Sequence, residues 1–416
     1  MLHDLFEILS FQSGYNTNVV LLGSCLLGTA GGVVGVFSLL RKRALISDAI
    51  SHATLPGITL GFLVALALTG TGKSLPFLMI GSTLSGILGV LLVQWIKDNT
   101  RLPEDSAIGT VLSSFFGLGV VLMSYIQTLK SGSQAGLESY LLGSTASMLQ
   151  SEAEMIAFSA LVITILAILF MKEFGLVCFD PEYAASRGWT VSKIDLLMMA
   201  LLLAVVVIGL KTVGLILIIA LVIIPPVAAR FWTDRLGFMV SISAFTGGLS
   251  CYLGAALSAL TPDLPSGATI VLTATSIFTL SLLFAPKRGI VAVALRQLSF
   301  RLKITRRRAL LSLDKGPASL TLLPSLLLRR EGVINSSGEL TSQGKKVVSL
   351  MAHDQALWNQ YLSDYPEEAF AQNKWSLVMI TDVLSFDLIK ELENSISGQN
   401  LSAGQNLVSC PLKDIS

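Results

Sequence analysis

The feature that most constrains this chain is a series of long apolar segments separated by short polar connections. About 20 consecutive apolar residues span the hydrocarbon core of a membrane as one α-helix. Only 13% of the residues are charged and 52% are hydrophobic, whereas about 25% are charged in an average soluble protein. The sequence therefore predicts an all-α polytopic membrane protein with eight or nine transmembrane helices. The apolar segments are 19–40, 46–69, 75–96, 107–127, 154–171, 194–210, 213–231, 238–260 and 268–285.

Basic residues indicate how the chain crosses the membrane. Lys and Arg gather in every second connection, and the other connections contain only Lys73, Lys130 and Lys211. Because basic loops stay on the cytoplasmic side, we expect a short extracytoplasmic lead (1–18) and a permease domain (19–288) that ends in the cytoplasm. The basic connections contain Arg41, Lys42, Arg43, Lys97, Arg101, Lys172, Arg187, Lys193, Arg230, Arg235, Lys287 and Arg288.

The composition changes after the last apolar segment. Residues 287–308 contain eight Lys or Arg and no acid. Such a run beside a membrane helix favours contact with anionic membrane lipid over contact with nucleic acid. We therefore predict a basic juxtamembrane linker (289–308), followed by a small cytosolic domain with a C-terminal tail (309–416).

Several patterns that carry chemistry are absent from the sequence. The four cysteines form no C-x-x-C pair, which argues against a disulfide framework or a cysteine-based zinc site. The sequence contains neither the phosphate-binding pattern G-x-x-x-x-G-K-[ST] nor the zinc-protease pattern H-E-x-x-H. We predict that the chain is no enzyme and holds no permanent cofactor, so any ATP hydrolysis belongs to a separate subunit.

Small residues recur along two of the apolar segments. The pairs Gly28–Gly32 and Gly31–Gly35 have four-residue spacing, and Gly81, Ser85 and Gly89 repeat it in the third segment. This spacing places small residues on one helix face and lets a second backbone approach closely. We predict close helix packing along both faces.

The most informative polar residues are Asp48 and His52, at the start of the second apolar segment. Four-residue spacing places both side chains on one face of a helix. A carboxylate and an imidazole can bind a divalent transition metal weakly, as transport requires. The alternative is that Asp48 caps the helix and His52 bonds to a neighbour. Pro56 and Gly57 follow, and predict a kink that frees backbone carbonyls.

The same stretch carries a family resemblance. SDAISHATLPG resembles the D-x-x-x-H-x-x-L-P-G signature of the permeases of zinc-, manganese- and iron-importing ABC transporters. Further similar blocks lie at 107–124, 140–144, 211–230 and 263–272, so the resemblance covers about residues 15–290. It implies a permease of the bacterial inner membrane that pairs with a second copy or a sister permease. It also implies a cytosolic ATPase, an extracytoplasmic metal-binding protein, and metal contact by Asp48 and His52, with Mn favoured over Zn or Fe.

A short helix is predicted between the fifth and sixth apolar segments. An aspartate at the N-cap, a proline at the first helical position and a glycine after the end are typical of a helix with defined limits. The segment resembles the coupling helix through which this family contacts its ATPase, although a solvated connector is the alternative. The candidate coupling residues are Asp180, Glu182, Ala184, Arg187 and Gly188.

Two further sets of residues are candidates for a role in transport. Pro225 and Pro226 interrupt the seventh apolar segment and, because proline kinks a helix, predict either a gate or simple kinked packing. Asp263 and Pro265 lie in an outward loop that is a candidate surface for the metal-binding protein.

The C-terminal residues carry a second resemblance. The stretch from Glu331 to Gly344 is similar to a turn of winged-helix repressors, and Ser349–Leu362 to the next helix of iron-dependent repressors. We therefore expect a winged-helix-like α/β domain that contacts a partner protein, and we do not expect DNA binding. The alternatives are a permease fused to a metal-responsive DNA-binding regulator, or an ion-coupled secondary metal transporter.

Overall fold

The computed structural model describes residues 14–70, 74–128, 150–260, 264–314, 322–335, 337–365 and 378–403. The first 13 residues of the predicted lead, the motif at 140–144 and Asp263 lie outside these residues. The chain divides into two compact units, Met1–Ala292 and Val293–Ser416.

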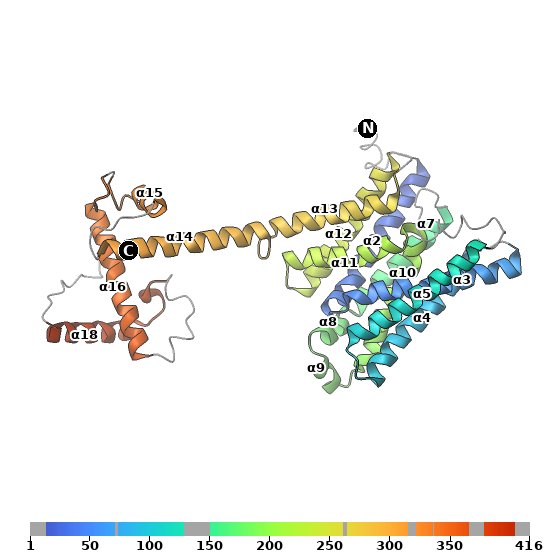
Figure 1. Cartoon of the computed structure of the whole chain (residues 1–416), viewed down its shortest axis with the longest axis horizontal. Coiled ribbons are helices and arrows are strands. Elements are labelled where there is room, and N and C mark those ends of the chain that lie inside the picture. The colour runs from blue at the N-terminus through green and yellow to red at the C-terminus, as the bar shows by residue number, and fades with distance from the viewer. Residues whose placement is uncertain are drawn as a thin grey trace. The chain divides into compact units, whose positions relative to one another are not determined.

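The first unit is a bundle of long apolar helices (Figure 1). Among the described residues, eight helices are long and apolar enough to cross a membrane, and α11 is a shorter apolar helix. All nine predicted segments are therefore helical, which confirms the all-α polytopic fold. The helices are α2 (Tyr15–Leu40), α3 (Ala44–Thr69), α4 (Leu75–Asn99), α5 (Glu104–Thr128), α7 (Gln150–Leu169), α10 (Val191–Val213), α11 (Leu215–Trp232), α12 (Leu236–Ala259) and α13 (Ser266–Phe284). Two short helices, α8 (Met171–Phe179) and α9 (Pro181–Ser186), connect α7 to α10.

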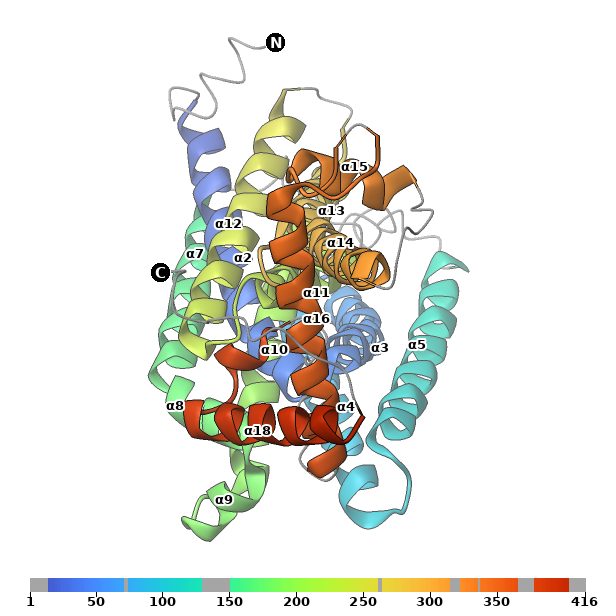
Figure 2. The ribbon, with the colours of Figure 1, turned by 90° about the vertical axis from the view of Figure 1, so that its left-hand side faces the viewer.

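The glycines of α2 pack against α12, as the small-residue spacing predicts. A Cβ atom at Gly28 would collide with the carbonyl oxygen of Gly247, and one at Gly32 with that of Ser243. The Ser243 hydroxyl donates a 2.7 Å hydrogen bond to the Gly32 carbonyl. Figure 2 shows α12 alongside α2. Direct contact between two backbones and a buried interhelical hydrogen bond hold this pair together.

Helix α4 packs against α3 in the same way. A Cβ atom at Gly57 would collide with the Gly81 carbonyl oxygen, and one at Gly81 with the Gly57 carbonyl oxygen. The Ser85 hydroxyl donates a 2.6 Å hydrogen bond to the Ala53 carbonyl. These contacts place α4 directly beside the segment of α3 that contains the candidate metal residues.

The two prolines of α11 lie inside the helix, and the Pro226 ring faces Gly35 of α2. Proline has no N–H, so Pro226 leaves the Val222 carbonyl without its intrahelical partner. A Cβ atom at Gly35 would collide with that carbonyl oxygen and would come within 2.8 Å of the Pro226 ring. The structure thus shows that the prolines take part in close helix packing, and their role in a gate stays a prediction.

The second unit is helical where it is described, so the expected winged-helix α/β domain is wrong for these residues. Its β-structure there is one isolated antiparallel bridge, between Ile334 and Leu340. The turn around this bridge has left-handed glycines, Gly332 and Gly338, and Thr341 caps the next helix. The predicted turn is present, but the described residues do not form the strands that would make a wing. The elements are α14 (Ile290–Asp314), which begins in the first unit, α15 (Leu322–Arg330), α16 (Ser342–Asp364), η2 (Ile380–Asp382) and α18 (Phe386–Ala403).

Buried polar contacts tie the elements of the second unit together. The carboxylate of Asp354 on α16 accepts a 2.8 Å hydrogen bond from Arg307 on α14 and a 2.7 Å hydrogen bond from the Ile380 amide. Trp358 is fully buried, and its indole N–H donates to the Val378 carbonyl at 3.2 Å. The core around it consists of Leu357, Trp358, Tyr361, Ile380, Ile389 and Leu392.

Candidate functional site

Asp48 and His52 lie on one face of α3, as their spacing predicts. The Nε2 atom of His52 is 3.2 Å from the Oδ1 atom of Asp48, so a carboxylate and an imidazole meet side by side. At a rise of about 1.5 Å per residue, His52 lies roughly 12 Å along α3 from Ala44. The side chains keep 33% and 20% of their surface exposed in the single chain. Both groups are thus accessible from outside the bundle.

The surroundings of His52 hold the ring and leave one nitrogen free. The Phe116 ring of α5 packs edge-on against the imidazole, with 4.9 Å between the ring centroids. The Nδ1 atom is buried and has no hydrogen-bond partner in the structure. The nitrogen that faces Asp48 is Nε2, so Nε2 is the imidazole atom that could share an ion with the carboxylate.

The proline and glycine that follow this pair lie between two neighbouring helices. Pro56 is inside α3 and cannot donate to the His52 carbonyl, so that oxygen loses its intrahelical partner. Gly57 contacts α4 at Gly81, and Gly119 of α5 contacts Pro56 from the other side. The polar pair therefore lies at a point where three helices approach closely.

The donor set can hold a metal only weakly. Among the described residues, no group of three or more His, Cys, Asp or Glu side chains could hold a metal ion. A structural zinc site normally has four ligands, whereas this site offers one carboxylate and one imidazole from the chain. An ion bound by so few ligands can leave, which suits a path and not a permanent site.

Helix α9 forms as the sequence predicts. The Asp180 carboxylate accepts a 2.9 Å hydrogen bond from the Tyr183 amide, and Gly188 has φ +85° after the helix end. Ala184 is buried, whereas Glu182 and the other side chains of α9 are partly or fully exposed. The helix protrudes from one end of the bundle (Figures 1 and 2). Its shape suits a docking element, and its coupling role stays a prediction.

The structure also places Arg187 and Pro265, two other residues predicted to contact partner proteins. Arg187 of the candidate coupling set donates a 2.9 Å hydrogen bond to the Tyr183 hydroxyl, so its guanidinium is oriented by α9 itself. Pro265 is the exposed residue before α13, so it lies on an accessible surface. Its role in contacting a binding protein stays a prediction.

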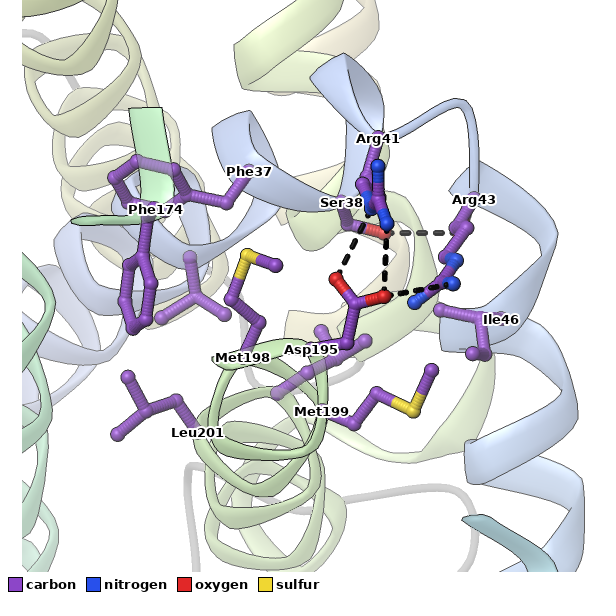
Figure 3. Close-up of a pocket in the computed structure, with 12 residues that line it drawn as sticks. Phe37, Ser38, Arg41, Arg43, Ile46, Phe174, Asp195, Met198, Met199 and Leu201 are labelled. Carbon is purple, nitrogen blue, oxygen red and sulfur yellow. Dashed lines mark hydrogen bonds and ion pairs between the residues drawn. The ribbon is translucent and has the colours of Figure 1, made fainter. Parts of the chain in front are cut away.

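A buried charge cluster lies at the end of the bundle from which α9 protrudes, and sequence reasoning missed it. The Asp195 carboxylate on α10 accepts two hydrogen bonds from Arg41, at 3.0 and 2.9 Å, and one from Arg43 at 3.1 Å (Figure 3). Asp195 is only 2% exposed. The sequence did contain a signal for this cluster, since Asp195 is an acid inside the predicted apolar segment 194–210. Ionisable residues at such positions are costly and usually have a partner. The two arginines were interpreted only as orientation signals.

Burial also affects the ionisable groups beside this cluster. Burial raises the pKa of the Cys178 thiol on α8 to about 11, and the charge of Arg41 opposes this only in part. The Cys178 thiol lies 3.8 Å from the Phe37 carbonyl. Burial alone would lower the pKa of Arg41, but its hydrogen bond to Asp195 and the charge of that carboxylate raise it. The guanidinium therefore stays charged, and the thiol stays neutral near neutral pH.

The sequence and fold both match known transport proteins. Residues 14–285 match the ABC-3 family, described as the ABC 3 transport family. The chain belongs to this family. In fold, this family member is similar to the structure described as PsaBC from Streptococcus pneumoniae in complex with Fab, with a TM-score of 0.60 and 30% sequence identity. The match covers 71% of this chain and all of that chain.

Curated relatives of this ABC-3 protein are named for metal transport. The manganese transport system membrane protein MntC of Bacillus subtilis is 40% identical over 382 residues, which cover 86% of this chain and 87% of the relative. The zinc transport system membrane protein TroC of Treponema pallidum is 38% identical and covers 69% of this chain and 95% of the relative. Because 86% of this chain is more than its first unit contains, the similarity to the Bacillus protein extends into the second unit.

Proposed function

We propose that this chain is the membrane permease subunit of an ABC importer that moves divalent manganese into the cytoplasm. The observation that carries the proposal is the Asp48–His52 pair, one helix turn apart in a 25-residue membrane span, with the imidazole Nε2 atom 3.2 Å from the Asp48 Oδ1 atom. Carboxylate and imidazole together suit Mn²⁺, Zn²⁺ and Fe²⁺. The 40% identity to a manganese transport protein over most of both chains favours manganese among them.

The other subunits follow from the same proposal. A cytosolic ATPase would dock on α9, an extracytoplasmic binding protein would deliver the metal, and a second permease copy or a sister permease would complete the path. Basic residues at the α9 end of the bundle support a cytoplasmic position for that end. Ion delivery between two permease chains is consistent with the partial exposure of Asp48 and His52 in the single chain.

The test is manganese uptake into vesicles that contain this permease with its ATPase and binding protein. We expect Asp48→Asn and His52→Gln each to lower uptake of radioactive Mn²⁺ at least tenfold, because each removes one of two side-chain ligands. Membrane insertion and binding of the ATPase should be unchanged. Competition by Zn²⁺ and Fe²⁺ in the same vesicles would rank the metals.

A matched control uses the histidine of the second unit. His353 lies 3.5 Å from Glu393 and far along the sequence from α3, so His353→Gln should leave uptake at the wild-type rate. Full uptake by either α3 variant would remove the site assignment. Uptake that stops when ion gradients collapse, but not when ATP is depleted, would replace the ABC importer by an ion-coupled carrier.

A further inference from the structure

The buried charge cluster at the α9 end of the bundle is built around one carboxylate. Both oxygens of Asp195 accept from arginines, Oδ1 from Arg41 and Oδ2 from both Arg41 and Arg43. The two arginines flank the short connection between α2 and α3, and Arg43 is the N-cap residue of α3. Asp195 on α10 therefore holds the connection that begins the metal-bearing helix.

The arginines also contact two other helices, and an ion pair extends the network to a third. Arg41 donates a 3.1 Å hydrogen bond to the Val177 carbonyl on α8. Arg43 forms an ion pair with Glu104 at the start of α5, and Glu104 forms a second ion pair, at 3.2 Å, with Lys97 at the end of α4. One connected network thus joins the ends of α2, α3, α4, α5, α8 and α10.

The position of α9 in the chain connects it to this network on both sides. Helix α9 lies between α8 and α10, and Arg41 contacts both of these helices, at Val177 and at Asp195. A displacement of α9 therefore reaches the same guanidinium from two sides. Arg43 lies five residues before Asp48 along the chain. A continuous contact route from α9 to the metal pair therefore runs through this network.

Three features of the network bear on how it could move. Breaking a buried ion pair leaves an unpaired buried charge, so such clusters exchange between discrete pairings instead of stretching gradually. A pocket lined by the flexible side chains of Met198 and Met199 lies beside the carboxylate (Figure 3). Lys42, between the two arginines, has φ +60°, a left-handed backbone conformation that is unfavourable for residues other than glycine.

We propose that Asp195 is a positioning residue of transport: its pairing with Arg41 and Arg43 transmits the movement of α9 to the start of α3 and so to Asp48 and His52. This inference rests on the proposed function. It assigns a role to residues outside both the Asp48–His52 pair and α9.

The test measures metal uptake per ATP hydrolysed in vesicles that contain the complete transporter. Asp195→Asn keeps the size of the side chain and removes its charge. We expect assembly with the ATPase and ATP hydrolysis to persist, while Mn²⁺ uptake per ATP falls at least tenfold. Asp195→Glu, which restores the charge, should recover part of the coupling. A merely structural role would lower assembly, hydrolysis and uptake together and leave their ratio unchanged, which would overturn the proposal.

Control variants separate the alternatives. Asp105 is an exposed acid on α5, one residue beyond Glu104, so Asp105→Asn should leave the ratio at the wild-type value. If Asp195→Asn does not assemble, Arg41→Lys tests the same network, because lysine keeps the charge and loses the bidentate contact with Asp195. An unchanged ratio in Arg41→Lys would then overturn the proposal.

A second readout does not depend on metal transport. Cys178 is half-buried next to Val177 on α8, so a change in its alkylation rate reports a rearrangement of the network around Arg41. In a protein whose other cysteines are alanine, binding of nucleotide to the ATPase should change that rate at least threefold. The change should disappear in Asp195→Asn. If the change persists in this variant, the proposed role of Asp195 is overturned. If the wild-type transporter takes up no Mn²⁺ but the change in alkylation rate is seen, only the proposed function is overturned.

Discussion

Replacement of Gly57 by alanine tests whether the close approach of α3 and α4 holds the segment of α3 that contains the metal pair. A Cβ atom at Gly57 would collide with the Gly81 carbonyl oxygen and would come within 2.5 Å of the Ser85 Cβ atom. The first obstacle is backbone, which cannot turn aside as the end of a flexible side chain can. Helix α4 must therefore move away from α3.

The size of the effect follows from two opposing contributions. Overpacking of a close contact costs about 1–3 kcal/mol. Alanine in place of glycine also favours a helix by about 1 kcal/mol, which offsets part of this cost. Gly109 on α5 provides the matched control, because it is helical and has no atom within 4 Å of a Cβ added there. Gly109→Ala therefore gains the helix preference of alanine without any collision.

The measurement is the free energy of unfolding of the two purified variants in mixed micelles, by titration with a denaturing detergent. Subtracting one variant from the other removes the helix contribution, so we expect Gly57→Ala to be less stable than Gly109→Ala by about 1–3 kcal/mol. Equal stabilities, within about 0.5 kcal/mol, would refute the close packing of α3 on α4.

Two further predictions concern groups outside the metal pair. Burial raises the pKa of the Cys178 thiol to about 11, and only the thiolate is alkylated, so the rate of its alkylation should rise about tenfold per pH unit from about pH 7 to about pH 10. A rate that levels off near the ordinary thiol pKa would contradict this burial. In the second unit, Asp354→Asn should lower stability by about 3 kcal/mol, because Arg307 loses its buried partner, and hydrogen exchange at the Ile380 amide should become roughly 100-fold faster. The same change at Asp364, which is exposed, should leave that exchange rate unchanged.

The second unit shows where local sequence signals stop being sufficient. The left-handed glycines Gly332 and Gly338 and the cap at Thr341 are all present, because turns and caps depend on a few neighbouring residues. A wing additionally needs two strands to pair, and pairing depends on contacts along the whole length of both strands. The described residues form a single bridge, between Ile334 and Leu340. The resemblance to a repressor therefore predicted the turn correctly and the β-structure wrongly.

The sequence by itself determined the membrane helices and the contacts that helical spacing and capping set within one helix. In lipid, an apolar segment of about 20 residues must satisfy its backbone hydrogen bonds internally and so must be helical. The meeting of Asp48 with His52 and the capping of α9 by Asp180 follow directly from helical geometry. Only the tertiary structure decided which helices meet. Asp195 and Arg41 are 154 residues apart in the chain, and no local pattern records that a buried acid on one helix pairs with a basic turn between two others.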